Sequence, residues 1–171
     1  MVLSDAAIVR VVVTDANIVI NLHHTSHLHL LGRLPGLRFV VPDEVILEIR
    51  EPSQAEMLRQ LILAGTLETT SVSGTDELLV FADLSSKLGL GESACLAIAQ
   101  SRGWLVASDE KRLFLREAIS RLGTARLLNT PGIFLLCIRA GLLDLEEADA
   151  AKDSLELHRY KMSFNSFRDL L

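Results

Sequence analysis

The chain has 171 residues, a length that suits one ordinary domain and is short for two. Hydrophobic residues make up 49% of the sequence and charged residues 23%, the balance of a folded protein, which excludes a disordered chain. Aromatic residues are only 5%, so we expect an aliphatic core, as in helices packed on a buried parallel sheet. The formal net charge of −5 argues against a strongly basic nucleic-acid-binding surface, but carboxylates gathered around divalent cations would also lower the total.

The sequence contains two cysteines, Cys95 and Cys137, and each lies in an apolar helical pattern. Their spacing fits neither a disulfide framework nor a zinc site, so we expect two buried free thiols. The N-terminal segment MVLSDAAIVR lacks the charged start and long apolar core of a signal peptide. No uncharged apolar run approaches the roughly 20 residues needed to span a bilayer. These features predict a cytoplasmic protein without a membrane anchor.

Apolar runs and helical patterns alternate along the first half of the chain. The β-branched run at residues 8–14 predicts a strand, and Asp15 follows it directly. Pro42, after a second apolar run, suits the first turn of a helix. The elements expected here are, in order, a strand at 8–14, a helix at 18–31, a strand at 37–41, helices at 43–51 and 53–64, and a weaker edge strand at 67–72.

The same alternation continues in the second half. The Gly89-Leu90-Gly91 turn ends one helical pattern and delivers Glu92 to the start of the next, which Gly103 ends. The elements expected here are helices at 76–87 and 92–102, a strand at 104–107, a helix opened by 108–109, a strand at 125–128, and helices at 132–141 and 145–158. Strand followed by helix with short connections predicts an α/β fold, a mostly parallel sheet with helices on both faces.

Three acidic residues fall near the ends of the expected parallel strands. Asp15 ends the first strand, Asp109 follows the strand at 104–107, and Glu92 opens the helix before that strand. Ligands of open parallel sheets bind at the carboxyl ends of the strands, so we expect these side chains to converge. Carboxylates in one cleft repel each other and are tolerated when a hard cation neutralises them. Mg²⁺ and Mn²⁺ prefer oxygen ligands, and a metal-bound water is a nucleophile suited to phosphodiester hydrolysis.

Each of these acidic residues also has a purely structural explanation. An Asp after a strand is often a helix N-cap, and a Glu in the first turn of a helix suits the helix dipole. For any one residue alone, that explanation is the more common one. For the three together, at the strand ends of an α/β pattern, the metal site is the favoured interpretation.

Several segments resemble the PIN-domain family in their order and spacing. VVVTDANIVI is similar to the opening strand of PIN domains, and VVPDEVILEI is similar to their second strand and Pro-led helix. LGLGESACLAIAQSRGWLVASDEKRL is similar to their Gly-Glu helix, next strand and acidic turn. NTPGIFLLCIRAGLL is similar to a PIN branch of uncharacterised bacterial and archaeal proteins related to VapC toxins. The resemblance implies a PIN-like three-layer α/β/α domain over residues 1–171, with a central sheet of about five strands and a C-terminal helix and tail (about 144–171) packed on it.

The resemblance also implies the residues of an active site. Its catalytic residues would be Asp15, Glu48, Glu92 and Asp109, with Mg²⁺ or Mn²⁺ bound directly by Asp15, Glu92 and Asp109. Glu48 would bind the metal through water or position the nucleophile. Glu44 shares its helix face and Glu51 lies on the same expected helix, so the choice of Glu48 stays open.

Further positions have supporting roles. By resemblance, Asn17 matches a small polar residue that helps to hold the site, and Thr130 matches a Thr or Ser near the last strand. Arg112 and Arg116 follow Asp109 at helical spacing, and would either hold phosphates beside the metal or form a solvated face. Some PIN domains carry another Asp where this chain has Glu110. The longer side chain of Glu110 is expected to point away from the site, so the binding of a second metal ion stays open.

The family implies a metal-dependent endoribonuclease that hydrolyses single-stranded RNA, here the toxin of a type II toxin–antitoxin pair. VapC toxins are silenced by a small antitoxin that lays a helix, and often an Arg, into the active site, and homodimers are usual. The implied partners are therefore RNA, a small antitoxin protein and a second copy of the chain.

Two other functions are compatible with parts of the sequence. A non-catalytic PIN scaffold that binds RNA or a protein partner would share the fold, and metal binding separates it from an enzyme. A phosphoryl-transfer protein of another class is less favoured. A haloacid-dehalogenase-like phosphatase needs an Asp where Asn17 stands, and the Asp–Lys pair of a receiver domain is not evident.

Two clusters stand apart from this site. The first is a group of four histidines, His23, His24, His27 and His29, for which a solvated or dimer-facing helix surface is favoured over a transition-metal site. The second is the set of tail aromatics, Tyr160, Phe164 and Phe167, which lie near basic residues. Docking of this tail on the domain or on a partner is favoured over stacking on nucleic-acid bases.

Overall fold

A computed structural model describes residues 8–171; the expectation about a signal peptide rests largely on residues 1–7, outside this range. Its centre is one sheet in the order β3-β2-β1-β4-β5, with every neighbouring pair parallel. The strands are β1 (Arg10–Thr14), β2 (Leu37–Pro42), β3 (Glu68–Thr70), β4 (Leu105–Ala107) and β5 (Leu127–Leu128). The predicted five-stranded parallel α/β sheet is therefore confirmed.

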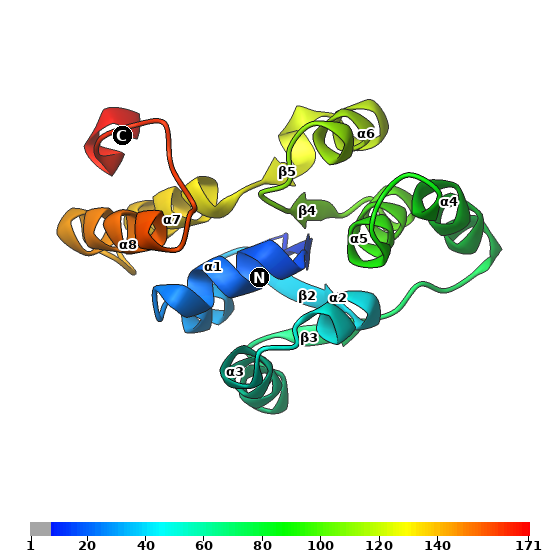
Figure 1. Cartoon of the computed structure of the whole chain (residues 1–171), viewed down its shortest axis with the longest axis horizontal. Helices are drawn as coiled ribbons and strands as arrows, with labels where there is room; N and C mark the ends of the chain where they lie inside the picture. Colours follow the sequence, from blue (N-terminus) through cyan, green and yellow to red (C-terminus); the bar gives the residue numbers. More distant parts are fainter. Residues whose placement is uncertain (1–7) are drawn as a thin grey trace, which may run out of the picture.

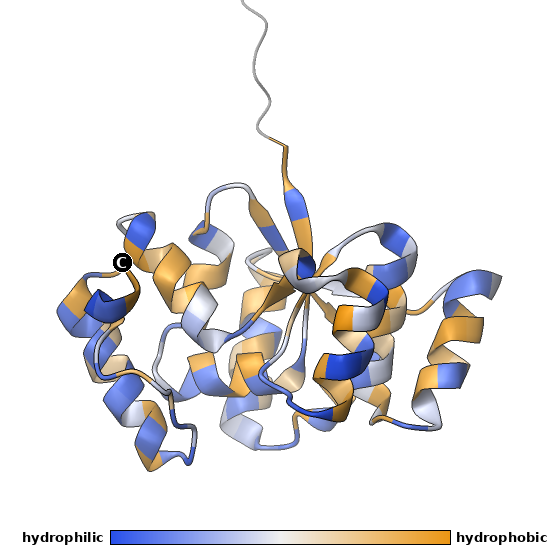
Figure 2. Cartoon of the chain, turned by 90° about the horizontal axis from the view of Figure 1, so that it is seen from above, coloured by the Kyte–Doolittle hydropathy of each residue, from blue (hydrophilic) through white to orange (hydrophobic). Residues whose placement is uncertain are grey.

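Helices flank the sheet on two sides. In Figure 1, α1, α7 and α8 lie on one side of the strands and α4, α5 and α6 on the other. The α-helices are α1 (Ala16–His24), α2 (Asp43–Glu48), α3 (Pro52–Leu63), α4 (Thr75–Ser85), α5 (Leu90–Arg102), α6 (Leu113–Leu122), α7 (Thr130–Arg139) and α8 (Leu145–Leu157). Three short 3₁₀ helices complete the described part, η1 (Leu28–Arg33), η2 (Thr124–Arg126) and η3 (Phe167–Leu170). Most helices show alternating polar and apolar bands along their length, the amphipathic pattern expected of helices covering a sheet (Figure 2).

The central strand β1 is buried on both faces. Val11, Val12 and Val13 are all buried, as expected for a parallel strand covered by helices on both sides. Val13 lies opposite Val40 of β2 and Val106 of β4. The strand order reverses between β1 and β4, and the crevice outside such a reversal is where α/β sheets bind ligands.

Helix α5 is buried along almost its whole length rather than on one face. Its buried residues include the small side chains Ala94, Ala97 and Ala99, which allow close packing against β1, β2 and β4. Gly103 ends the helix in the left-handed conformation, with φ of 71°. The burial of α5 explains the apolar run at residues 94–99 and fixes where the first turn of the helix meets the sheet.

Two expected helices have different boundaries in the structure. The pattern at 18–31 forms α1 and then η1, because the chain reverses at Ser26, whose φ of 61° is left-handed. The helix expected to open at Ser108 and Asp109 begins only at Leu113. That prediction was wrong because Ser108 and the Asp109 amide bond to Asp15 and Asn17 instead of starting a helix. In addition, Arg112 has a φ of 53°, which is incompatible with a right-handed helix passing through it.

The expected helix at 43–51 also ends early. Helix α2 stops at Glu48, and Glu51 serves instead as the N-cap of α3. The Glu51 carboxylate accepts the Gln54 backbone N–H at 2.8 Å, and Pro52 occupies the first turn of α3. Glu51 is thereby separated from Glu44 and Glu48, which remain together on α2.

The C-terminal segment docks on the rest of the structure. Phe167 is fully buried, with its ring centroid 5.7 Å from Phe134 of α7 and 5.0 Å from Phe164. Asp149 of α8 accepts the Ser166 hydroxyl at 2.6 Å and the Phe167 amide at 2.8 Å. Docking of the tail aromatics is therefore confirmed. Over residues 8–171, no helix is both long enough and apolar enough to cross a membrane.

A single arginine ties α5 to the segment after β3. Arg102 makes a bidentate pair with Glu77, with N–O distances of 2.6 and 2.9 Å, and also donates to Thr70 and the Ser71 carbonyl. The Glu77 side chain is only 5% exposed. Burial works to raise the pKa of Glu77, but the bonds from Arg102 and the Ser73 amide outweigh it and lower the pKa overall.

Removal of this arginine should destabilise the fold strongly. Arg102→Met leaves the Glu77 charge buried without a partner, which typically costs about 3–5 kcal/mol. Urea unfolding at pH 7 measures the change, and Arg102→Met combined with Glu77→Gln should recover part of the loss. Arg59→Met, which breaks an exposed pair with Glu56, is the matched control and should leave the free energy of unfolding nearly unchanged. Equal losses in the two single variants would contradict this account.

Candidate active site

The first acidic residue, Asp15, follows β1 at the central edge of the sheet. It is the N-cap of α1, and its Oδ1 accepts the Ala16 amide at 2.8 Å. Its Oδ2 accepts the Ser108 hydroxyl at 2.8 Å, and its own amide donates to the Ala107 carbonyl at the end of β4. Asp15 is only 3% exposed. The strand reversal between β1 and β4 therefore holds this carboxylate in place from both strands.

The surroundings of Asp15 disfavour its charge. The pKa of Asp15 is raised to about 6, chiefly by burial and to a smaller extent by the negative charges of Glu92 and Glu110, while the bonds from Ser108 and Ala16 act against the shift. An ionised, buried carboxylate with acidic neighbours is destabilising unless a proton or a cation compensates it.

Glu48 approaches the first turn of α5. Its Oε1 accepts the Gly91 amide at 2.8 Å, a favourable position for an anion at a helix N-terminus. A Cβ at position 91 would lie 2.5 Å from Glu48 Oε2, so the carboxylate reaches this amide only because residue 91 is glycine. The turn before α5 thus both exposes an amide to Glu48 and places Glu92 one residue later.

Glu92 is held more loosely than Glu48. Its carboxylate accepts only a long bond of 3.4 Å from the Gly89 amide. Burial raises the pKa of Glu92, and the charges of Glu110 and Glu48 add to the effect. Glu92 therefore faces the same group of carboxylates as Asp15 and is free to move toward a ligand.

Asp109 connects four parts of the chain through its carboxylate. Oδ2 accepts the Asn21 side-chain amide of α1 at 2.8 Å and the Thr130 hydroxyl at 2.5 Å. Oδ1 accepts the Thr130 amide at 2.8 Å and the Tyr160 hydroxyl of the tail at 2.7 Å. A carboxylate has about four acceptor positions, so these bonds use all of them. A direct metal bond from Asp109 would replace one of these bonds.

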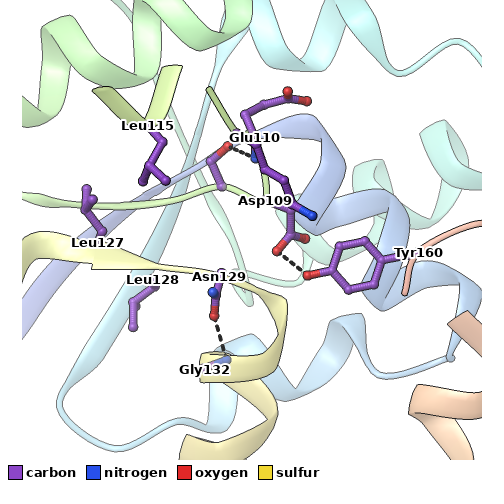
Figure 3. A pocket seen from close by; sticks show the side chains of 10 residues that line it. Asp109, Glu110, Leu115, Leu127, Leu128, Asn129, Gly132 and Tyr160 are labelled. Carbon is purple, nitrogen blue, oxygen red and sulfur yellow. Dashed lines mark hydrogen bonds between the residues drawn. The ribbon is translucent and has the colours of Figure 1, made fainter. Parts of the chain in front are cut away.

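Asn17 positions the loop that carries Asp109 and Glu110. Its Oδ1 accepts the Asp109 amide at 3.1 Å, and its Nδ2 donates to Glu110 Oε1 at 3.0 Å. The carboxylates of Asp109 and Glu110 point in opposite directions (Figure 3). Glu110 was expected to point away from the site, but it faces Asn17, and its charge acts on both Asp15 and Glu92. Asn17, which was expected to support the site, thus bonds to both Asp109 and Glu110.

The acidic group surrounds one buried thiol. Cys95 on α5 is fully buried, and burial raises its pKa well above the usual value, with further contributions from Asp15, Glu48, Glu44 and Glu92. Cys95 and Cys137 are both buried and free, as expected. A thiol kept protonated in this way is an inert part of the floor beneath the carboxylates.

The remaining predicted residues lie outside the carboxylate group. Arg112 is exposed at the start of α6 and forms no ion pair with any residue in the 8–171 range. His23, His24 and His27 are half-buried and His29 is exposed. His23 lies 3.3 Å from the Ser53 hydroxyl, His24 stacks on His158, and His27 packs edge-on against Phe134. This helix surface is therefore partly solvated, and its dimer-facing role stays a prediction.

Comparison with known proteins gives a match over most of the chain. A family model described as PIN domain (DUF3368) matches residues 11–164. The chain belongs to the PIN-domain family. The match runs from β1 to the tail and includes every acidic residue of the site. No relative among curated proteins matches the chain.

PIN domains are typically metal-dependent nucleases, so the fit of a divalent cation matters here. The donor set suits Mg²⁺ or Mn²⁺, because Asp15, Glu48 and Glu92 offer carboxylate oxygens, the ligands these cations prefer. In addition, Glu44 Oε2 is buried without a hydrogen-bond partner in the described chain, as is expected of an oxygen that lacks its ligand. Within residues 8–171, no three acidic, His or Cys side chains already converge as ligands of one ion. The residues therefore fit the cation in the chemistry of their donors, although they are not arranged around one point.

Several residues of this PIN site had no clear signal in the sequence. Ser108 bonds to Asp15, and Asn21 bonds to Asp109. For Asn21, the only indication in the sequence was its i+4 spacing from Asn17, which places both on one face of a helix. Tyr160 reaches Asp109 across 51 positions of sequence. No local pattern reports a contact of that kind, because it depends on how α8 returns the chain to the sheet.

Because the pKa of Asp15 is raised, the effect of Asp15→Asn on the free energy of unfolding should depend on pH. The folded state favours protonated Asp15, so its stabilising contribution is complete below about pH 4 and is lost as the pH rises through about 6. Asp15→Asn removes this titration. In EDTA, its stability relative to wild type should improve by about 2–3 kcal/mol between pH 4 and pH 8. Urea unfolding across this range measures the change, and a constant difference would show that Asp15 has an ordinary pKa.

Asp109 and Glu110 should differ sharply in their effect on stability. Asp109→Asn places an amide donor against donors from Asn21, Thr130 or Tyr160, and should cost about 2–3 kcal/mol. Glu110→Gln changes an exposed side chain with one bond from Asn17, and should stay within about 0.5 kcal/mol of wild type. Thermal and urea unfolding at pH 7 in EDTA measure both. A small loss for Asp109→Asn would count against its role as the connecting carboxylate.

Proposed function

We propose that this PIN domain is an endoribonuclease that cuts single-stranded RNA with Mg²⁺ or Mn²⁺. Family membership supports nuclease chemistry in general. The observation that carries the proposal is Asp15, a buried carboxylate with a pKa of about 6, placed where the sheet reverses and facing Glu92 and Glu110. Its charge needs a cation for compensation, and phosphodiester hydrolysis is the reaction that such a site serves.

Each acidic residue has a proposed role. Asp15 and Glu92 would bind the cation directly, and Asp109 would do so by giving up one of its four bonds. Glu48, held by the Gly91 amide, would position the attacking water or bind the cation through water. When bound, the cation would lower the pKa of a water and offset the negative charge on the phosphate.

Basic side chains beside the site support a polyanionic substrate. Lys111 and Arg112 directly follow Glu110, and Arg116 lies on the first turns of α6. All three are exposed, and none pairs with an acidic residue elsewhere in the described chain. They would hold the RNA backbone while the carboxylates act on one phosphate. This local cluster answers the objection raised by the net charge of −5.

The biological context is a second part of the proposal. We propose that the chain acts as a toxin restrained by a small antitoxin and that it forms a homodimer, both from its likeness to VapC toxins. Large exposed apolar side chains on α2 and α3, Leu47 at 76% and Leu63 at 72% exposure, offer a surface that a protein partner could cover.

A non-catalytic scaffold is the second candidate. One observation favours it: no three ligand side chains are preassembled around a single point in residues 8–171. A scaffold would bind RNA or a partner without needing Asp15 ionised. Calorimetric titration with Mn²⁺ separates the two, because the scaffold predicts no binding that depends on Asp15.

Cleavage of labelled single-stranded RNA tests the proposal. Wild type should cut the RNA with Mn²⁺ or Mg²⁺ and not with EDTA. Asp15→Asn should lower the rate by about 100-fold or more, since it removes a charge from the centre of the site. Urea unfolding of the same variant at pH 8 shows whether it is folded under the assay conditions, so that a lower rate is separated from a loss of structure.

The matched control is Glu56→Gln, which removes an exposed carboxylate on α3 that bonds to Arg59 and Gln60 of the same helix. It should cut RNA at the wild-type rate. Cutting that persists in EDTA, or that survives Asp15→Asn, would exclude the proposed site. Absence of both cutting and Mn²⁺ binding would favour the scaffold.

A further inference from the structure

A cavity of about 360 Å³ lies beside the acidic site, at the carboxyl ends of β4 and β5 (Figure 3). Its walls come from the loop after β4, from α6, from β5 with the first turn of α7, and from the tail. We propose that this cavity is a subsite for one nucleobase of single-stranded RNA. The proposal rests on the proposed function for the choice of substrate, and it goes beyond it by naming where a base is selected.

The floor of the cavity is apolar. Leu115 of α6 contributes to it together with Leu127 and Leu128 of β5. Leu115 is 40% exposed, and Leu127 and Leu128 are only partly buried, so apolar surface of all three remains open to a ligand. Ligand pockets of about 300–1,000 Å³ are mostly apolar with a few placed polar groups, and bases of single-stranded RNA bind through their flat faces. The floor fits the face of a base better than it fits a charged group.

One wall is an aromatic ring whose position is fixed. The Tyr160 hydroxyl donates to Asp109 Oδ1 at 2.7 Å. Aromatic side chains beside a backbone-binding groove are the usual platforms for bases of single strands. The ring therefore stands ready before RNA binds, at no further cost in side-chain order.

The polar edge of the cavity suits the edge of a base. Asn129 is the N-cap of α7, and its Oδ1 accepts the Gly132 amide at 2.8 Å. This bond fixes the side chain and leaves the Nδ2 group, which has no partner within residues 8–171, able to donate to a base carbonyl. A Cβ at Gly132 would lie 3.1 Å from Asn129 Oδ1, so a larger residue there would crowd this arrangement.

The cavity also joins the reaction site directly. Ser108 lines it and donates to Asp15 Oδ2 at 2.8 Å, and Asp109 and Glu110 form its border. A nucleotide with its base on the leucines therefore has its phosphate beside the carboxylates, within the region of Lys111. An uncharged base tolerates the negative border, whereas the phosphate needs the cation and the basic side chains.

Binding of short RNA in EDTA tests this subsite without cleavage. Fluorescence anisotropy would follow labelled pentauridylate, pentaadenylate and pentacytidylate, together with an abasic ribose-phosphate pentamer. Wild type should bind at least one of the three base-containing pentamers about tenfold more tightly than the abasic one. Leu115→Glu should remove that preference, because it charges the apolar floor.

Ile119→Glu is the matched control, since it lies one turn further along α6, is 43% exposed, and does not line the cavity. It adds the same charge and should keep the preference for bases. Equal binding of abasic and base-containing pentamers by wild type, or equal effects of the two variants, would overturn the subsite. Metal-dependent cutting without base preference would exclude the subsite alone, whereas base preference without cutting would exclude the nuclease alone.

Discussion

The burial of β1 is the constraint on which the rest of the site depends. A parallel strand covered on both faces has to be apolar along its length, and Val11, Val12 and Val13 meet that requirement. The first polar side chain after the strand, Asp15, is therefore still in a low-dielectric environment at the sheet edge, with only 3% of its surface exposed. The same packing that stabilises the fold raises the pKa of this carboxylate and creates the demand for a cation.

Around this point the two adjacent acids after β4 have separate tasks. Asp109 gathers α1, α7 and the tail through bonds from Asn21, Thr130 and Tyr160, so its carboxylate stabilises the arrangement of segments around the site. Glu110 is exposed and faces the charges of the other carboxylates. Asp109 thus stabilises the packing of these segments, and Glu110 remains available to a ligand. Two neighbouring acids in the sequence do not reveal this difference.

The C-terminal segment is part of the site rather than an appendage to it. Asp149 and Phe167 dock the tail on α7 and α8, and this docking sets Tyr160 against Asp109. Tyr160 is at once a partner of an acidic residue and a wall of the cavity at β5. Changes in how the tail packs would therefore reach both the carboxylates and the proposed base subsite.

The sequence by itself determined the parallel α/β fold, the position of Asp15 after β1 and the position of Glu92 in the first turn of α5, because these follow from local periodicity and from turn residues. The order and spacing of its motifs also indicated the family. It did not determine that α6 begins at Leu113, that Glu110 accepts a bond from Asn17, or that Tyr160 reaches Asp109. Those features depend on contacts between segments far apart in the chain. Only the packing of α1, α7 and the tail around one carboxylate decided them, since hydrogen bonds across that distance leave no periodic trace in the sequence.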